Sequence, residues 1–280
     1  MRAIALLATH NEERFIVPCL EHLVRHGLEA YVIDNESEDG TVPLARRFLG
    51  RGLIGIETFP RRGVYRWQMI LERKEQLAST LDADWFMHAD PDEVRLPPHS
   101  GTTLADALAE VGRQGFNAVN FLEFAFVPTR QSPDHDHPDF LQTMRRYYPF
   151  SPSLPNRLNA WAKQPGPVEL AWSGGHLVRF PGLRIHPTSF PMRHYLFLSL
   201  DHAVRKYVQK EYAPEELALG WHRARSRLRA EDIALQDEGE LRQYVSDDLL
   251  DPSHPLRRHP LFDSQPTPLS DQGPGPRRRP

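Results

Sequence analysis

The chain has 280 residues, of which 40% are hydrophobic and 25% are charged, as is usual for a globular protein. Its formal net charge of −3 argues against binding to nucleic acid through bulk electrostatics. Cys19 is the only cysteine, so no intrachain disulfide forms. No run of about 20 apolar residues predicts a transmembrane segment. We therefore expect a cytoplasmic protein with no membrane-spanning helix.

The first third of the chain alternates apolar strands with amphipathic helices. Strands are predicted at residues 4–8, 30–33, 53–59 and 85–88, and helices at residues 15–26, 42–49 and 66–81. Such alternation is typical of parallel strands joined by right-handed crossovers. The fold class predicted from this pattern is α/β, with a mostly parallel central sheet.

The remaining chain carries weaker signals. A helix is predicted at residues 104–111 and a strand at residues 118–127, followed by a long irregular loop over residues 128–170. Two further helices are expected at residues 196–212 and 215–228. Residues 263–280 are rich in proline and are predicted to be a disordered tail.

Three carboxylates, Asp90, Asp92 and Glu93, follow the predicted fourth strand. Pro91 cannot donate to a ladder, so the strand ends there and the acids lie at its carboxyl end. Two carboxylates about 4 Å apart repel by roughly 4 kcal/mol at an effective dielectric constant near 20. A divalent cation such as Mg²⁺ or Mn²⁺ would relieve this repulsion and is bound by such oxygen ligands. The alternative interpretation is a solvated acidic turn.

Polar residues also follow the first two predicted strands. Thr9, Asn11 and Glu12 come after the first strand, and Asp34 and Asn35 come after the second. In a doubly wound sheet these loops converge with the fourth strand on one crevice. Taken singly, they could be helix caps. No glycine-rich G-x-G-x-x-G or Walker-type loop follows the first strand, which argues against a dinucleotide site.

Three segments together resemble a known family: ATHNEE (8–13), VIDNESEDGT (32–41) and DWFMHADPDEV (84–94). Their order resembles glycosyltransferase family 2, which has the GT-A fold, in the subgroup with D-N-x-S-x-D-G-T and D-x-D-E motifs. A fainter similarity continues in SGGH (173–176) and RHYLFLSLDHAVRKY (193–207).

The resemblance implies a GT-A-like sandwich with a helical C-terminal extension. Residues 1–212 would form the glycosyltransferase domain, with a nucleotide-binding half (1–95) and an acceptor half (96–212). Residues 213–262 would form the extension, ahead of the tail at 263–280.

The resemblance also implies roles for individual residues. Asp34 would accept a hydrogen bond from the nucleotide base. Asn35 replaces the second aspartate of the commoner pattern, so the resemblance does not determine which base is bound. The full set of donor-binding residues implied is Thr9, Asn11, Glu12, Asp34, Asn35, Arg73 and Asp90. Arg73 could equally be a solvated helix arginine.

A metal site and a base complete the prediction. Asp90 and Asp92 would hold Mg²⁺ or Mn²⁺, and His194 is a weaker candidate ligand that could instead be a packing residue. Asp92, through the metal, would assist departure of the diphosphate. Glu123, expected to face outward, is a weak candidate for the general base, with Asp134, Asp136 and Asp139 as competitors.

The predicted activity is metal-dependent and inverting transfer of a sugar from a nucleotide-diphosphate donor to a saccharide, lipid-linked or protein acceptor. A nucleotidyltransferase on a related sheet is the first alternative, although it would be expected to carry a glycine-rich, basic loop after the first strand. A non-catalytic nucleotide-sugar-binding protein is the second.

Overall fold

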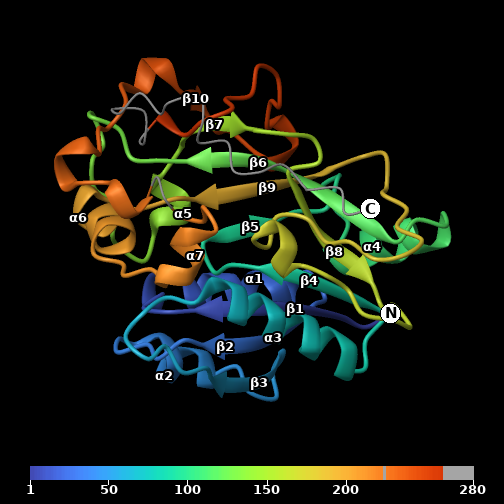
Figure 1. Ribbon diagram of the computed structural model, residues 1–280. Helices are drawn as coiled ribbons and strands as arrows, with labels where there is room; N and C mark the ends of the chain where they lie inside the picture. The colour runs from blue at the N-terminus through green and yellow to red at the C-terminus, as the bar shows by residue number, and fades with distance from the viewer. Residues whose placement is uncertain (223–224, 261–280) are drawn as a thin grey trace.

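The computed structural model describes residues 1–222 and 225–260. Within these residues, ten strands form one sheet, whose main path has the order β10-β7-β6-β8-β4-β1-β2-β3. Strand β9 pairs with β6, and β5 pairs with β9 beside this path. Figure 1 shows the N-terminal strands at one end of the sheet and the later strands at the other.

The N-terminal end of the sheet is parallel, as predicted. It consists of β3 (Leu53–Thr58), β2 (Glu29–Asp34), β1 (Ala3–Thr9) and β4 (Trp85–Ala89). The connections contain α1 (Glu13–Arg25), α2 (Thr41–Arg46) and α3 (Trp67–Thr80). The predicted α/β class, and each of these seven elements to within a few residues, are confirmed.

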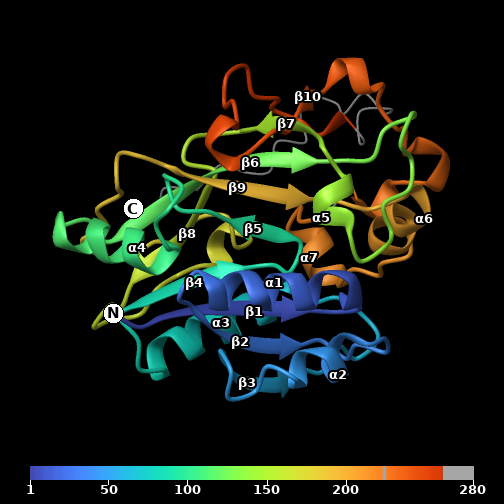
Figure 2. The ribbon, with the colours of Figure 1, turned by 180° about the vertical axis from the view of Figure 1, so that it is seen from behind.

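Helices α1 and α3 cover opposite faces of this sheet, because successive residues of β1 point to opposite sides. Ala5 and Leu7 of β1 belong to the core that contains Leu20 of α1. Ile4 and Leu6 belong to the core that contains Leu71 of α3, and Figures 1 and 2 show the two helices on opposite sides. Burial on both faces explains why β1 has no alternation of polar residues.

The other end of the sheet is mostly antiparallel and was only partly foreseen. Strand β6 (Ala118–Phe126) and helix α4 (Leu104–Arg113) were predicted. Strands β5 (Glu93–Arg95) and β9 (Phe190–Tyr195) were not. The loop predicted at 128–170 is wrong, because it contains α5 (Phe140–Thr143), β7 (Arg146–Phe150) and β8 (Arg157–Ala162). Strand β8 lies between β6 and β4 and its sequence has no β-branched residue, so pairing rather than propensity makes it a strand.

The two late helices were also predicted too long. Residues 196–212 contain only α6 (Leu200–Ala203), which Ser199 caps, and a π-helical turn at Val204–Val208. In the second segment the only α-helix in the described residues is α7 (Pro214–Ala218), which is followed by Gly220 at a φ of 92°. Glycine in that conformation stops a helix because side chains resist it.

The C-terminal extension is not the helical segment that was expected. After α7 its described residues form 3₁₀ turns at Arg225–Arg227, Ala230–Asp232, Glu238–Glu240 and Asp247–Leu249, and strand β10 (Arg242–Gln243) adds to β7. A further 3₁₀ turn lies earlier in the chain, before β9, at Ala171–Ser173.

The tail predicted at 263–280 lies outside the described residues. Among the residues described, no helix combines the length and apolarity needed to cross a bilayer.

Candidate active site

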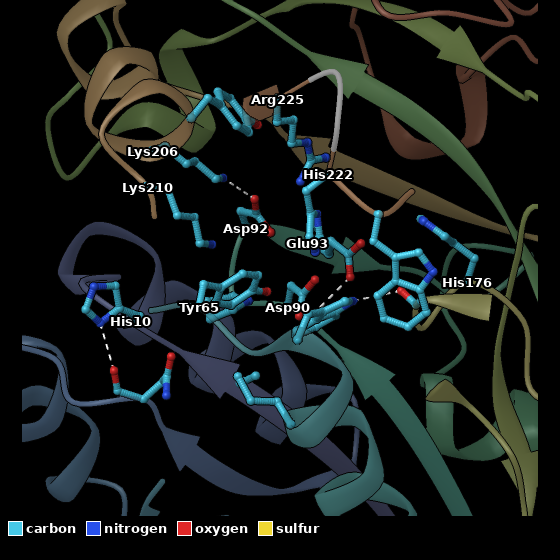
Figure 3. Close-up of a pocket in the computed structure, with 18 of the residues that line it drawn as sticks. His10, Tyr65, Asp90, Asp92, Glu93, His176, Lys206, Lys210, His222 and Arg225 are labelled. Carbon is cyan, nitrogen blue, oxygen red and sulfur yellow. Dashed lines mark hydrogen bonds and ion pairs between the residues drawn. The ribbon is translucent and has the colours of Figure 1, made fainter. Parts of the chain in front are cut away.

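A cavity of about 760 Å³ lies where β1, β2 and β4 end. Its floor is formed by residues at or just after the ends of these strands, including Thr9, Asn35, Asp90 and Asp92. Its roof is formed by residues 206–222 and Arg225, from the segment after β9. The prediction that the first, second and fourth strand ends converge is therefore confirmed at the level of geometry, and Figure 3 shows the arrangement.

One end of the floor combines residues from β1 and β2. The Thr9 hydroxyl donates to Asp34 Oδ1 at 3.2 Å, and Asp34 Oδ2 accepts from the Ser37 amide at 3.1 Å, so Asp34 lies behind Thr9 and does not line the cavity. Asn35 does line it. The Asn35 Nδ2 group donates to the Phe59 carbonyl at 2.9 Å, which leaves the buried Oδ1 without a partner. An unpartnered buried acceptor is costly unless a ligand supplies a donor.

His10 adds a second acceptor beside Asn35. Its Nδ1 lies 2.9 Å from the Asn35 carbonyl oxygen. A carbonyl can only accept, so Nδ1 carries the proton and Nε2 keeps its lone pair. His10 lines the same end of the cavity, although only Thr9, Asn11 and Glu12 were predicted from this turn.

Glu12 and Asn11 are separated by the structure. Glu12 lines the cavity, and its Oε2 has no hydrogen-bond partner. Burial raises the pKa of Glu12 to about 8, an effect that nearby Lys206 opposes. Asn11 is exposed, and its Oδ1 instead accepts from the Glu38 amide at 2.8 Å, which ties the β1 turn to the β2 turn.

The acidic turn after β4 contributes Asp90, Asp92 and Glu93 to the cavity lining. The turn is closed by two hydrogen bonds of 3.1 Å between Asp90 and Glu93, one of them from the Asp90 amide to Glu93 Oε2. Asp90 Oδ1 lies 3.8 Å from the ammonium of Lys74, which is fully buried on α3. Burial and the neighbouring Glu93 raise the pKa of Asp90.

Asp92 is partnered by two cations from the C-terminal half. Its Oδ2 accepts a hydrogen bond from Lys206 Nζ and lies 3.3 Å from His194 Nε2. Although burial opposes the change, these two partners hold the pKa of Asp92 well below its usual range. The turn is therefore not a solvated acidic loop.

His194, the weaker candidate for a metal ligand, lies between two carboxylates, and each of its ring nitrogens faces one of them. Its Nδ1 contacts Glu123 Oε1 at 2.6 Å, while Nε2 faces Asp92. Burial lowers the pKa of His194, but the two acids outweigh it and raise that pKa to about 9. Both ring nitrogens of the resulting imidazolium carry protons.

Glu123 does not face outward, which corrects the expectation from the sequence. It is buried at 1% exposure on β6, does not line the cavity, and is paired with Arg157 Nε at 2.8 Å and with His194. Although burial opposes the change, Arg157 and His194 keep the pKa of Glu123 well below normal. Held in this way, Glu123 orients two cations and is not placed to take a proton from an acceptor.

The remaining candidates lie away from the cavity lining. Arg73 makes a bidentate pair with Glu57 of β3, at 2.7 and 2.8 Å, so its guanidinium is committed to the edge of the sheet. Asp136 pairs with Arg14 and Arg205. Asp134 accepts from the Asp136 amide, and Asp139 precedes α5.

The roof supplies groups that the sequence did not single out. Lys206, Lys210 and Arg225 line the cavity, and Figure 3 shows them on the side opposite Asp90. The Lys210 ammonium lies 3.6 Å from the centre of the Tyr65 ring, a cation–π contact. In the sequence, the signal for Lys206 is its place in the segment 193–207, which resembles glycosyltransferase family 2.

Aromatic rings flank the cavity beside these cations. Tyr65 stacks on Trp67 with ring centres 5.7 Å apart, and Tyr212 stacks on His222 at 4.7 Å. Segments far apart in the sequence meet here, because the Tyr65 amide donates to the Glu211 carbonyl at 2.8 Å. Flat rings of this kind can pack against a nucleoside or a sugar face.

The far end of the cavity is built by the SGGH segment. Gly175 has a φ of 88°, and a Cβ there would lie 2.9 Å from His88 Nε2, so only glycine allows this close approach. His176 Nδ1 lies 3.0 Å from Arg157 Nη1, which can only donate. The proton of neutral His176 therefore lies on Nε2, where it is a hydrogen-bond donor.

The donor set of the floor fits a hard divalent cation only in part. In the described residues, no group of three or more histidine, cysteine or carboxylate side chains is arranged to hold a metal. Mg²⁺ and Mn²⁺, however, commonly bind through one or two carboxylates and complete their shell with water and substrate phosphates. Asp90, whose side chain is 33% exposed, and Asp92 match that chemistry once the Lys206 ammonium leaves Asp92.

No family model and no curated protein matches the chain. Among solved structures, it is similar to TarS from S. aureus at 11% identity and a TM-score of 0.41, over 70% of this chain and 60% of that one. It is also similar to glucosyl-3-phosphoglycerate synthase from Mycobacterium tuberculosis, solved with Mn²⁺, UDP and phosphoglyceric acid, at 21% identity and a TM-score of 0.29. That match covers 44% of this chain and 43% of the other.

The chain thus spans less than two thirds of either of these proteins. At such TM-scores the likenesses carry no argument, and the α/β assignment rests on the strand order and pairing described above.

Proposed function

We propose that the chain is a glycosyltransferase of the GT-A type that takes its sugar from a nucleoside-diphosphate donor. The observation that carries the proposal is the cavity itself, which has carboxylates on its floor and three basic side chains on its roof at the carboxyl ends of parallel strands. The resemblance of the β1, β2 and β4 turns to glycosyltransferase family 2 supports the same activity. A saccharide, a lipid-linked sugar or a protein would be the acceptor.

In this proposal the donor lies along the floor. Asn35 Oδ1 and His10 Nε2 are acceptors for the nucleoside, with Asp34 holding Thr9 behind them. Lys206, Lys210 and Arg225 bind the diphosphate, and the Nε2–H of His176 donates to the sugar or the acceptor.

The metal part of the proposal concerns Asp90 and Asp92. These two carboxylates would hold Mg²⁺ or Mn²⁺, which would neutralise the charge that develops on the departing diphosphate. The roof cations act on the same charge, and such stabilisation lowers the barrier because it is strongest in the transition state. Inversion by direct displacement remains part of the proposal, and the anomeric configuration of the product tests it.

Two alternatives predict different products. A nucleotidyltransferase would release pyrophosphate, but the turn after β1, His10–Glu12, has no glycine and no lysine or arginine to cradle a triphosphate. A binding protein would release nothing.

Incubation of the protein with Mn²⁺ and either nucleotide sugars or nucleoside triphosphates separates these three activities. We expect slow release of nucleoside diphosphate, since many transferases hydrolyse their donor without an acceptor. Release of pyrophosphate from nucleoside triphosphates, or no release at all, would contradict the proposal.

Asp92→Asn should abolish metal-dependent binding of the donor in calorimetry, because it removes the anionic ligand and keeps the shape. Asp84→Asn is the matched control, since Asp84 flanks β4 at its opposite end, where it accepts from the Arg2 amide at 2.6 Å. Unchanged donor affinity in Asp92→Asn would remove Asp92 from the site.

A further inference from the structure

The carboxylate of Asp92 already has a counter-ion that belongs to the chain. Lys206 Nζ donates to Asp92 Oδ2, and Figure 3 marks this contact. Asp92 is 6% exposed, and the Lys206 side chain is 18% exposed, so solvent screens the pair only weakly. An ion pair of this kind is held far more firmly than one on an open surface.

The position of Lys206 is set by its backbone and by two further contacts. It lies in the π-helical turn Val204–Val208, and π-helical turns are frequent at functional sites. Its ammonium also donates to the Leu196 carbonyl at 3.0 Å and lies 5.5 Å from the centre of the Phe15 ring. The ammonium is therefore held near Asp92 by the ion pair and by two further contacts, to a carbonyl oxygen and to an aromatic ring.

A divalent cation and the Lys206 ammonium cannot both occupy Asp92 Oδ2. Both are positive, and the oxygen is already shared with His194 at 3.3 Å. A metal bound through either oxygen of Asp92 would lie close to the Lys206 ammonium and be repelled by it, so the metal binds more tightly once Lys206 finds another anion. The cavity can hold such an anion beside Lys206, because Lys206 and Lys210 both line it.

We propose that Lys206 is the resident counter-ion of Asp92 in the free protein and moves to the donor's diphosphate when the donor binds. Metal and nucleoside diphosphate then bind together, each favouring the other, and metal alone binds weakly. This inference rests on the proposed function and adds a positioning role for one lysine and an order to the binding events.

The test measures Mn²⁺ binding by electron paramagnetic resonance of the free ion. Mn²⁺ is titrated into the protein alone, and into the protein with UDP or GDP, whichever raises its melting temperature. We expect Mn²⁺ to bind about 5- to 150-fold more tightly with the nucleotide, the usual range for coupled sites. Binding of Mn²⁺ to UDP or GDP without protein is measured separately and subtracted.

Lys206→Met removes the ammonium and keeps the length of the chain. Mn²⁺ should then bind the nucleotide-free protein about as tightly as it binds the parent complex, while the nucleotide binds more weakly. Lys206→Arg keeps the charge and should bind Mn²⁺ as weakly as the parent. Arg205→Met is the matched control, because Arg205 lies in the same π-helical turn, pairs with Asp136 and is outside the cavity lining, and it should leave Mn²⁺ binding to the free protein unchanged.

Two results would overturn the inference while leaving the proposed function intact. One is equal Mn²⁺ affinity with and without a nucleotide that binds, and the other is unchanged Mn²⁺ binding in Lys206→Met with a melting temperature close to that of the parent. If neither nucleotide nor any nucleotide sugar binds under any condition, the proposed function itself fails.

Discussion

The floor and the roof of the cavity are built in different ways. The floor follows regular parallel strands, and β1 and β4 are buried along most of their length. The roof follows short helical turns, α6, the π-helical turn and α7, whose residues are mostly half-buried or exposed. The floor therefore places its carboxylates directly after a buried strand, whereas the roof brings its basic side chains on short turns that only some buried residues, such as Ala203 and Tyr207, anchor.

The acidic and the basic side chains of the cavity therefore come from different kinds of structure. Asp90 and Asp92 come at the end of a strand, and a strand end is a fixed position in a sheet. Lys206, Lys210 and Arg225 come from a segment of low regularity, where side chains can move between partners. Elements with few buried contacts are the ones that open most readily.

The largest expected effect is a difference in stability between two leucine-to-alanine variants, one in the floor and one in the roof. Leu7→Ala deletes a fully buried side chain in β1 of the floor, and we expect a loss of about 2–5 kcal/mol in the free energy of unfolding. Leu219→Ala removes the same atoms from an exposed roof position, 58% accessible, and should change stability by about 0.5 kcal/mol or less. Urea unfolding measures both, and similar losses would mean that the roof is as well packed as the floor.

A second test concerns acid stability of the N-terminal half. His22 of α1 is buried and contacts the Arg95 carbonyl at 2.7 Å, and burial lowers its pKa to about 4 despite that hydrogen bond. The unfolded chain binds the proton near pH 6.5, so stability is full above that pH and falls as pH drops from 6.5 toward 4. The shift corresponds to roughly 3 kcal/mol.

Unfolding free energies measured between pH 7 and pH 4 check this prediction. His22→Gln keeps a hydrogen-bonding side chain and removes the titration, so its stability should fall less steeply over the same range. An unchanged pH dependence in the variant would show that His22 is not among the groups that make the fold acid-labile.

The smallest effect is expected at Arg73, which was predicted to approach the nucleotide. Its pair with Glu57 is partly exposed, so Arg73→Ala should cost about 0.2–1 kcal/mol in stability. Nucleotide binding should not change, because the guanidinium lies outside the cavity lining. A loss of nucleotide affinity in calorimetry would place Arg73 in the site after all.

The floor could be predicted because its information is local. Continuous apolar runs make β1, β2 and β4 recognisable, and each polar residue that matters follows a strand end within a few positions. The local sequence does not show which of these polar residues line the cavity. Asn35 and Thr9 face it, while the neighbouring Asp34 and Asn11 do not, because hydrogen bonds to Thr9, Ser37 and Glu38 turn them away.

The roof and the burial of Glu123 were decided by tertiary structure alone. Strand β6 has partners on both edges and is buried on both faces, so its alternation of side chains carried no information about which residues are exposed. Lys206 meets Asp92 across 114 positions of sequence. The sequence by itself determined that anionic groups gather at one sheet edge, and the folded chain decided which cations meet them, because long-range pairing has no local pattern.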